Sequence, residues 1–221
     1  MNIPYILHFL ERLQQNNSKD WMDNHRDEYL QAKRYFIELI DHLIKELQAF
    51  DASLHGVTAQ QCLFRINKND FSKKGEAPYK SHFGAGISLG GRHSPFANYV
   101  LLLEPGDGSR IGGGIRKPTT RQLELIREEI DYNPGKLRQV LQKPEFSKIW
   151  GDFRGDQRKL PPKGYDKTHP ELDLLTYNGF QVLRYYKDKE VQQAGFIDIL
   201  PSLYKEVKPL HDFLNSALTE L

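Results

Sequence analysis

Apolar residues recur at helical spacing near the start of the chain. Ile6, Phe9, Leu10 and Leu13 follow one another at i, i+3, i+4 and i+7, which predicts a short amphipathic helix. A second helical stretch is predicted over residues 19–50, as one helix or two in series, because apolar residues share one face and charged residues the other. The apolar face consists of Phe36, Leu39, Ile40, Leu43, Ile44 and Leu47.

The middle of the chain changes to short apolar runs that are typical of strands. Strands are predicted at residues 62–68, 83–89, 98–104 and 110–115. The turn Pro105-Gly106-Asp107-Gly108 separates the last two and predicts a hairpin, because Gly and Asp adopt positive φ angles at low cost. Strands this close in sequence favour antiparallel pairing.

Helices and irregular segments alternate in the rest of the chain. We expect a helix capped by Thr119 or Thr120 with further turns to residue 150, a short helix at 171–177, a strand at 181–186 and a helical segment at 189–221. The order of elements does not repeat a βαβ unit, so it predicts a single α+β domain over residues 1–221. Its central, largely antiparallel sheet would be flanked by N-terminal and C-terminal helices.

Composition and charge narrow the classes of partner. The 221 residues include 31 basic and 29 acidic side chains, for a formal charge of +2, and 38% are hydrophobic, which indicates a packed globular protein. This balance counts against a protein that coats nucleic acid or an anionic membrane. The longest strongly apolar run, residues 99–103, is far shorter than the roughly 20 residues of a membrane span, and no secretory signal pattern is present. With Cys62 as the only cysteine, no internal disulfide can form, and we expect a cytoplasmic protein without a membrane partner.

The first basic segment is the predicted loop at residues 65–82. Residues 62–82 hold five basic and two acidic side chains, a local charge of +3. If the flanking strands pair, Arg65 and His82 lie near the same end of the sheet, and Arg65 can form two hydrogen bonds to a carboxylate or phosphate. The candidate ligand-binding residues are Arg65, Lys68, Ser72, Lys73, Tyr79 and Lys80, and the candidates for proton transfer are Asp70 and His82. The alternative is a solvated hairpin loop with lysines that face water.

The second basic segment, residues 154–169, again holds five basic and two acidic side chains. A long irregular stretch that is restricted by prolines favours a structured binding loop, with Lys163, Tyr165 and His169 as candidate ligand-binding residues. The alternative is a crossover that tethers the chain over one sheet face. The two segments total 37 residues and carry +6, so the other 184 residues carry −4.

The sequence contains no common phosphate-loop motif, no histidine metal-binding motif and no candidate cysteine nucleophile. The glycine run 112–114 matches neither common phosphate-loop spacing, and it indicates a bulge or a close approach of another group to the backbone. The eight histidines form no His-Glu-x-x-His pair, so we predict no metal site and assign no cofactor. Cys62 lies in an apolar run and is expected in the core rather than as a nucleophile.

Four blocks of residues carry a resemblance to a known family. They are residues 13–21 with Asn16, Asn17 and Trp21; residues 65–80 with Arg65-Ile66, Phe71-Ser72-Lys73 and Pro78-Tyr79-Lys80; the 112–114 glycines with Pro118 and Ile126-Arg127; and Pro162-Lys163-Gly164-Tyr165 with His169-Pro170. Over roughly residues 7–180 the chain resembles the family catalogued as domain of unknown function 2461. The resemblance implies a single domain found mainly in bacteria, with no established reaction. The arginine that relatives tend to carry just before the Phe-Ser pair is missing here, so Lys68 or Lys74 would have to take its place in binding.

Two hypotheses on function remain. The first is an enzyme or ligand-handling domain that binds a small phosphorylated or carboxylated molecule through the two basic segments. The second is a non-catalytic module that binds nucleic acid or an acidic protein, with Trp21, Tyr79 and Tyr165 as stacking surfaces. We favour the first, because local basic loops in a nearly neutral chain suit a confined anion better than an extended polyanion. The sequence predicts neither the reaction nor the oligomeric state.

Overall fold

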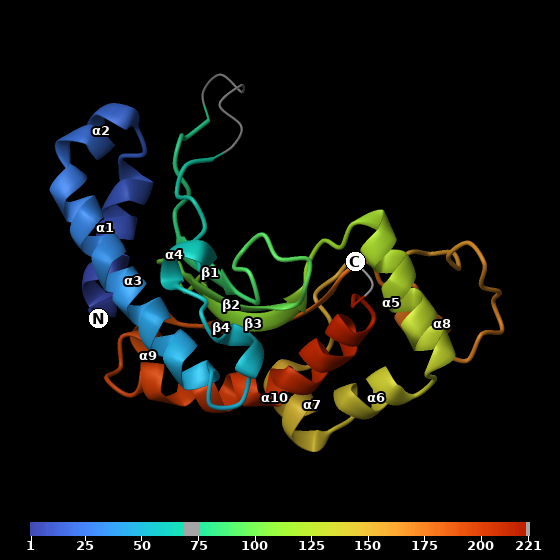
Figure 1. Ribbon diagram of the computed structural model, residues 1–221. Helices are drawn as coiled ribbons and strands as arrows, with labels where there is room; N and C mark the ends of the chain where they lie inside the picture. Colours follow the sequence, from blue (N-terminus) through green and yellow to red (C-terminus); the bar gives the residue numbers. More distant parts are fainter. Residues whose placement is uncertain (69–75, 220–221) are drawn as a thin grey trace. The chain divides into compact units, whose positions relative to one another are not determined.

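The computed structural model describes residues 1–68 and 76–219, and the N-terminal part is helical as predicted. Helix α1 (Ile3–Gln15) is followed by α2 (Lys19–Asn24) and α3 (Arg26–Leu47), so the long stretch consists of two helices in series. The apolar positions of α1 and α3 are buried, and these two helices lie side by side (Figure 1). Ser18 caps α2 by accepting a hydrogen bond from the Trp21 amide at 3.2 Å.

The predicted strand at residues 62–68 is wrong. After the short 3₁₀ helix η1 (Ala52–Leu54), this region begins with helix α4 (Ala59–Cys62) and continues only as isolated antiparallel bridges at Leu63 and Asn67. Helix α4 forms because Thr58 donates its amide to the Gln61 side chain at 2.9 Å, and because Asp41 accepts the Ala59 amide at 3.1 Å. The apolar run therefore begins in a helical turn.

A four-stranded antiparallel sheet forms the β part of the fold, which confirms the α+β class. Strands β1 (Phe83–Ile87), β2 (Asn98–Leu103), β3 (Ser109–Ile115) and β4 (Phe180–Tyr186) lie in sequence order across the sheet. The predicted hairpin joins β2 to β3, with φ angles of 77° at Gly106 and 62° at Asp107. Residues 83–89, 98–104, 110–115 and 181–186 are thus correctly predicted as strands to within a few residues.

The glycines of β3 allow close packing rather than phosphate binding. A Cβ atom on Gly112 would lie 2.1 Å from the Val182 carbonyl oxygen, and one on Gly114 would lie 2.0 Å from that of Phe180. Strand β4 therefore approaches the β3 backbone more closely than a side chain permits. This confirms the interpretation that another group lies against the glycine backbone.

The remaining helices follow the predicted order. Thr119 caps the helix that follows β3, accepting the Gln122 amide at 3.3 Å, and residues 151–169 form no regular element apart from a bridge between Gln157 and Tyr177. The helices after β3 are α5 (Thr120–Tyr132), α6 (Lys136–Leu141), α7 (Pro144–Trp150), α8 (Leu172–Leu175), α9 (Asp188–Val191) and α10 (Phe196–Ser216). The last two of these, α9 and α10, form the C-terminal segment.

The chain divides into two compact units, each built from several segments. Unit 1 comprises Met1–Arg92, Val100–Ile111 and Tyr185–Pro201; unit 2 comprises His93–Tyr99, Gly112–Arg184 and Ser202–Leu221. The expectation of one domain stays a prediction.

Each unit has its own aromatic packing. In unit 1 the ring centroids of Phe36 and Phe83 lie 5.6 Å apart, and in unit 2 those of Tyr99 and Tyr204 lie 5.4 Å apart. Within the described part of the chain, no helix combines the length and the apolar character needed to cross a membrane.

Candidate functional site

The first basic segment belongs to unit 1, and its described ends are part of an irregular two-stranded ribbon. Its antiparallel bridges join Leu63 to Ala85 and Asn67 to Tyr79. Residues 64–66 on one side therefore face residues 80–84 on the other, so the segment that leads into β1 has two extra residues and must bulge. A bulge allows consecutive side chains to turn towards one side, whereas in a regular strand they alternate.

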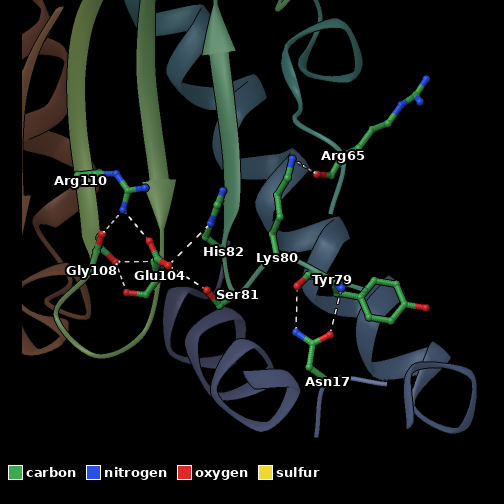
Figure 2. Close-up of polar contacts among 10 residues, drawn as sticks. Asn17, Arg65, Tyr79, Lys80, Ser81, His82, Glu104, Gly108 and Arg110 are labelled. Atoms are coloured by element: carbon green, nitrogen blue, oxygen red, sulfur yellow. Dashed lines mark hydrogen bonds and ion pairs between the residues drawn. The ribbon is translucent and has the colours of Figure 1, made fainter. Parts of the chain in front are cut away.

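The side chains of this bulge meet a carboxylate at the end of β2 (Figure 2). The Ser81 hydroxyl donates to Glu104 Oε1 at 2.9 Å, and His82 Nδ1 lies 3.8 Å from the same oxygen. Arg110 Nη1 donates to Glu104 Oε2 at 2.6 Å and to the Gly108 carbonyl at 2.8 Å. We call Ser81, His82, Glu104 and Arg110 the Glu104 cluster; it fastens the bulge to the β2–β3 hairpin.

The cluster shifts the pKa of both titratable partners. Burial favours the neutral form of Glu104, but hydrogen bonds from Arg110 and Ser81 and the nearby positive charges outweigh it, so the Glu104 pKa is lowered. Burial lowers the pKa of His82; the charges of Arg110 and Lys80 act in the same direction, while Glu104 opposes them. The neutral form of His82 is therefore favoured. Asp70, the other candidate for proton transfer, lies outside the described residues.

Arg65 and His82 are neighbours along the ribbon, but the structure does not bring their side chains together. Lys80 Nζ donates to the Arg65 carbonyl at 2.7 Å, which holds the backbone, while the Arg65 guanidinium extends away from the Glu104 cluster (Figure 2). Burial and the charge of Arg92 lower the pKa of Lys80. Lys80 is therefore a backbone anchor in this structure.

Tyr79 is held through its backbone in a similar way. Asn17 Nδ2 donates to the Tyr79 carbonyl at 2.9 Å, and the Tyr79 amide donates to Asn17 Oδ1 at 3.0 Å. The side-chain amide of Asn17 thus pairs with Tyr79 as a neighbouring strand would. Ser72 and Lys73, the remaining candidates of this segment besides Lys68, lie outside the described residues.

A pocket of about 190 Å³ lies beside the ribbon in unit 1. Three basic residues, Lys33, Arg65 and Arg92, line it, and no acidic residue does so among the described residues. Its aromatic lining consists of Tyr29, Phe36, Phe64 and Phe83, and the other residues are Gln60, Leu63, Ile66, Asn67 and Gly84. We call this the basic aromatic pocket.

The polar groups of the basic aromatic pocket are suited to bind an anion. Arg92 is held by donating to the Leu63 carbonyl, whereas Lys33 and Arg65 form no ion pair with any described residue. Burial raises the pKa of the Tyr29 phenol, so it stays protonated and can donate a hydrogen bond. Arg65 is exposed, and a guanidinium can bind a carboxylate or phosphate in a bidentate manner.

Comparison with protein families matches residues 5–213 to DUF2461, described as a conserved hypothetical protein. The chain belongs to this family. No curated protein and no solved structure matched the chain. Membership of DUF2461 brings no reaction with it, so a functional conclusion must come from the geometry.

The second basic segment of this DUF2461 chain is held by contacts within unit 2. His169 Nε2 lies 3.0 Å from Asp131 Oδ1, and His169 Nδ1 accepts the Glu171 amide at 3.1 Å, so Nε2 carries the proton. The Tyr165 ring meets the His169 ring edge-on, at a centroid distance of 5.4 Å. Lys163 is exposed.

The backbone of this segment also pairs with β4 and with the chain that leads into it. Arg154 donates its amide to the Gln181 carbonyl at 2.7 Å, and Arg158 donates to that of Thr176 at 2.8 Å. These bonds favour the crossover interpretation for residues 154–158. Ligand binding by Lys163, Tyr165 and His169 stays a prediction.

Several charged residues with defined contacts were not among the candidate site residues predicted from the sequence. Arg127 is buried in unit 2, where Nε donates to the Leu175 carbonyl at 2.9 Å and Nη2 to that of Tyr177 at 3.2 Å. Its position on the apolar face of α5 is a sequence signal for a buried arginine. Lys33 and Arg92 have no such signal, because only the tertiary fold brings them to the pocket.

Two further observations concern alternative functions of the DUF2461 chain. The Trp21 ring has His25 stacked on it at 4.1 Å and the Arg12 guanidinium over it at 5.7 Å, so its surface is engaged within the protein. Among residues 1–68 and 76–219, no group of three or more histidine, cysteine or acidic side chains is arranged to hold a metal ion.

Proposed function

We propose that this DUF2461 protein binds a small organic anion, a carboxylate or a phosphate, in the basic aromatic pocket. The observation that carries the proposal is the pocket lining, which includes Lys33, Arg65 and Arg92 and, among the described residues, no aspartate or glutamate. Cationic side chains that share a small pocket repel one another, and a bound anion would relieve this repulsion. Hydrogen bonds to an ionised group also contribute more than neutral ones.

The roles of the residues differ. Arg65 would supply the bidentate contact, Arg92 and Lys33 would add charge, and the Tyr29 hydroxyl would donate a further hydrogen bond. Lys80 would act indirectly by fixing the Arg65 backbone. Proton transfer by His82 or Asp70 stays a prediction, because His82 faces Glu104 and is not among the residues that line this pocket.

The test measures the binding of benzoate and inorganic phosphate by titration calorimetry, with mass spectrometry of the purified protein to detect a retained anion. We expect Arg65→Ala to weaken the binding of whichever anion binds by about 10- to 100-fold, since a hydrogen bond to a charged group contributes roughly 1.5–3 kcal/mol. Lys68, a ligand-binding candidate from the sequence, lies on the same ribbon but does not line the pocket, so the proposal expects Lys68→Ala to leave anion binding nearly unchanged. Lys45→Ala, at an exposed position on α3 outside the pocket lining, is the control for the loss of one positive charge.

The non-catalytic binding module is the alternative outcome of this test. Steeply salt-dependent binding to a labelled single-stranded oligonucleotide, weakened equally by Arg65→Ala and Lys68→Ala, would favour that module and contradict the pocket. Absence of anion binding to the unmodified protein would also contradict the proposal.

A further inference from the structure

The basic aromatic pocket is lined by two buried and two half-buried aromatic residues. Phe36 and Phe83 are buried, with 2% and 5% of their surface exposed, and their ring centroids lie 5.6 Å apart. Tyr29 packs on Phe83 at 6.2 Å, and both Tyr29 and Phe64 are only partly covered. Both residues line the pocket.

The position of Phe64 depends on a glycine in β1. The Phe64 amide donates to the Gly84 carbonyl at 2.8 Å, and a Cβ atom on Gly84 would lie only 2.8 Å from Phe64 Cδ2. The ring therefore lies directly against the β1 backbone, in space that any other residue at position 84 would fill. Aromatic rings prefer to pack against other rings edge-on or offset, so a pocket lined by the Phe64 ring should prefer flat ligands.

The size of the pocket limits the ligand. An apolar cavity of about 150 Å³ is known to hold one benzene molecule, and this pocket has about 190 Å³. One six-membered ring therefore fits, with space left for a single carboxylate-sized group.

We infer that the ligand is an aromatic carboxylate with a single ring, whose ring lies against Phe64 and Tyr29 and whose carboxylate meets Arg65, Arg92 and Lys33. This inference rests on the proposed function, to which it adds the chemical class of the ligand. The aromatic residues and the basic residues line the same pocket, so one small molecule can contact both. Arginine near the ligand can also bind the face of the ring.

The test compares benzoate, cyclohexanecarboxylate and acetate on the unmodified protein by calorimetry or ligand-observed NMR. Benzoate should bind at least 10-fold more tightly than acetate, because the ring is buried, and about 2- to 10-fold more tightly than cyclohexanecarboxylate, because aromatic pairs contribute beyond area burial. Phe64→Leu should abolish the preference for benzoate over cyclohexanecarboxylate. Phe96→Leu, at a half-buried phenylalanine in unit 2, is the control.

The outcomes separate this inference from the proposed function. If all three carboxylates bind equally and Arg65→Ala weakens each of them, the aromatic class is wrong while anion binding stands. If benzoate and cyclohexanecarboxylate bind equally tightly, the pocket is merely apolar, and the inference is again overturned. If no carboxylate binds, both proposals fail. The ligand series uses the unmodified protein, so the test does not depend on the folding of the variants.

Discussion

The Glu104 cluster offers a direct test of how the bulge before β1 is held. Glu104→Gln keeps the shape of the side chain but removes its charge. The side chains of Glu104 and Arg110 are 22% and 21% exposed, so the variant leaves a largely covered guanidinium without its counter-ion. Losing a charge-assisted hydrogen bond of 2.6 Å should cost about 2 kcal/mol of the free energy of unfolding. For a chain of this size that corresponds to a decrease in Tm of about 4–8 °C.

The assay is urea denaturation followed by circular dichroism at pH 7, with Glu11→Gln as the matched control. Glu11 is exposed on α1 and forms no hydrogen bond or ion pair with a described residue, so its substitution should change the stability by less than about 0.5 kcal/mol. Equal destabilisation by the two substitutions would refute a specific role for Glu104.

The pH dependence provides a second check on the same variant. The pKa of Glu104 is lowered in the folded state, so its carboxylate stabilises the fold above the unfolded pKa of about 4.3, and this contribution is lost as the pH falls through the folded pKa. The difference between the unmodified protein and Glu104→Gln should therefore shrink below about pH 4. A difference that stayed constant from pH 3 to pH 7 would contradict the assigned ionisation.

His82 adds an effect at higher pH. Its pKa is lowered in the folded state, so the unfolded chain binds more protons below about pH 6.5, and stability should decrease as the pH falls from there towards the folded pKa. Because Glu104 partly opposes this shift, Glu104→Gln should lower the His82 pKa further, which an NMR titration of His82 would show. An unchanged or raised pKa would be inconsistent with the contact.

Three other substitutions or reactions test separate features. Gly114→Ala should cost about 3 kcal/mol or more in urea denaturation, because the new Cβ meets the Phe180 carbonyl and the residue has a φ of +114°; a change below about 1 kcal/mol would contradict the close approach. Asn17→Ala should cost about 1–2 kcal/mol, because it removes both hydrogen bonds to the Tyr79 backbone, whereas Asn17→Asp keeps only the bond accepted from the Tyr79 amide; no loss of stability in Asn17→Ala would contradict this pairing. Burial raises the pKa of Cys62 to about 11, so at pH 8 about one thiol in a thousand is ionised and iodoacetamide should react only after unfolding; rapid reaction of the folded protein would disprove this.

The fold could be predicted well wherever one local pattern decided the structure. The helices followed from the 3.6-residue apolar repeat, and the β2–β3 hairpin followed from a turn whose Gly106 and Asp107 have positive φ angles. The failure at residues 62–68 has a physical cause, since the Thr58–Gln61 hydrogen bond begins a helical turn just before an apolar run that alone resembles a strand. A short apolar run cannot distinguish these two outcomes.

The candidate site was predicted only in part. The sequence identified Arg65 through a local excess of positive charge, and Arg65 does line the basic aromatic pocket. Lys33, from α3, and Arg92, which follows β1, join it through tertiary packing that no spacing in the sequence encodes. Arg65 and His82 both lie on the ribbon, but His82 lies beside Glu104 while the Arg65 guanidinium extends away from the Glu104 cluster.

The glycine run in β3 bears on how the protein can be engineered. A Gly-Gly-Gly tract is ordinarily chosen as a place to insert a tag, to join two proteins or to permute the chain, because such tracts usually behave as flexible linkers. Here Gly112, Gly113 and Gly114 each lie within 2.6 Å, measured from an added Cβ, of an atom on β4 or α10. The most linker-like stretch of the sequence is thus among the worst positions for a fusion.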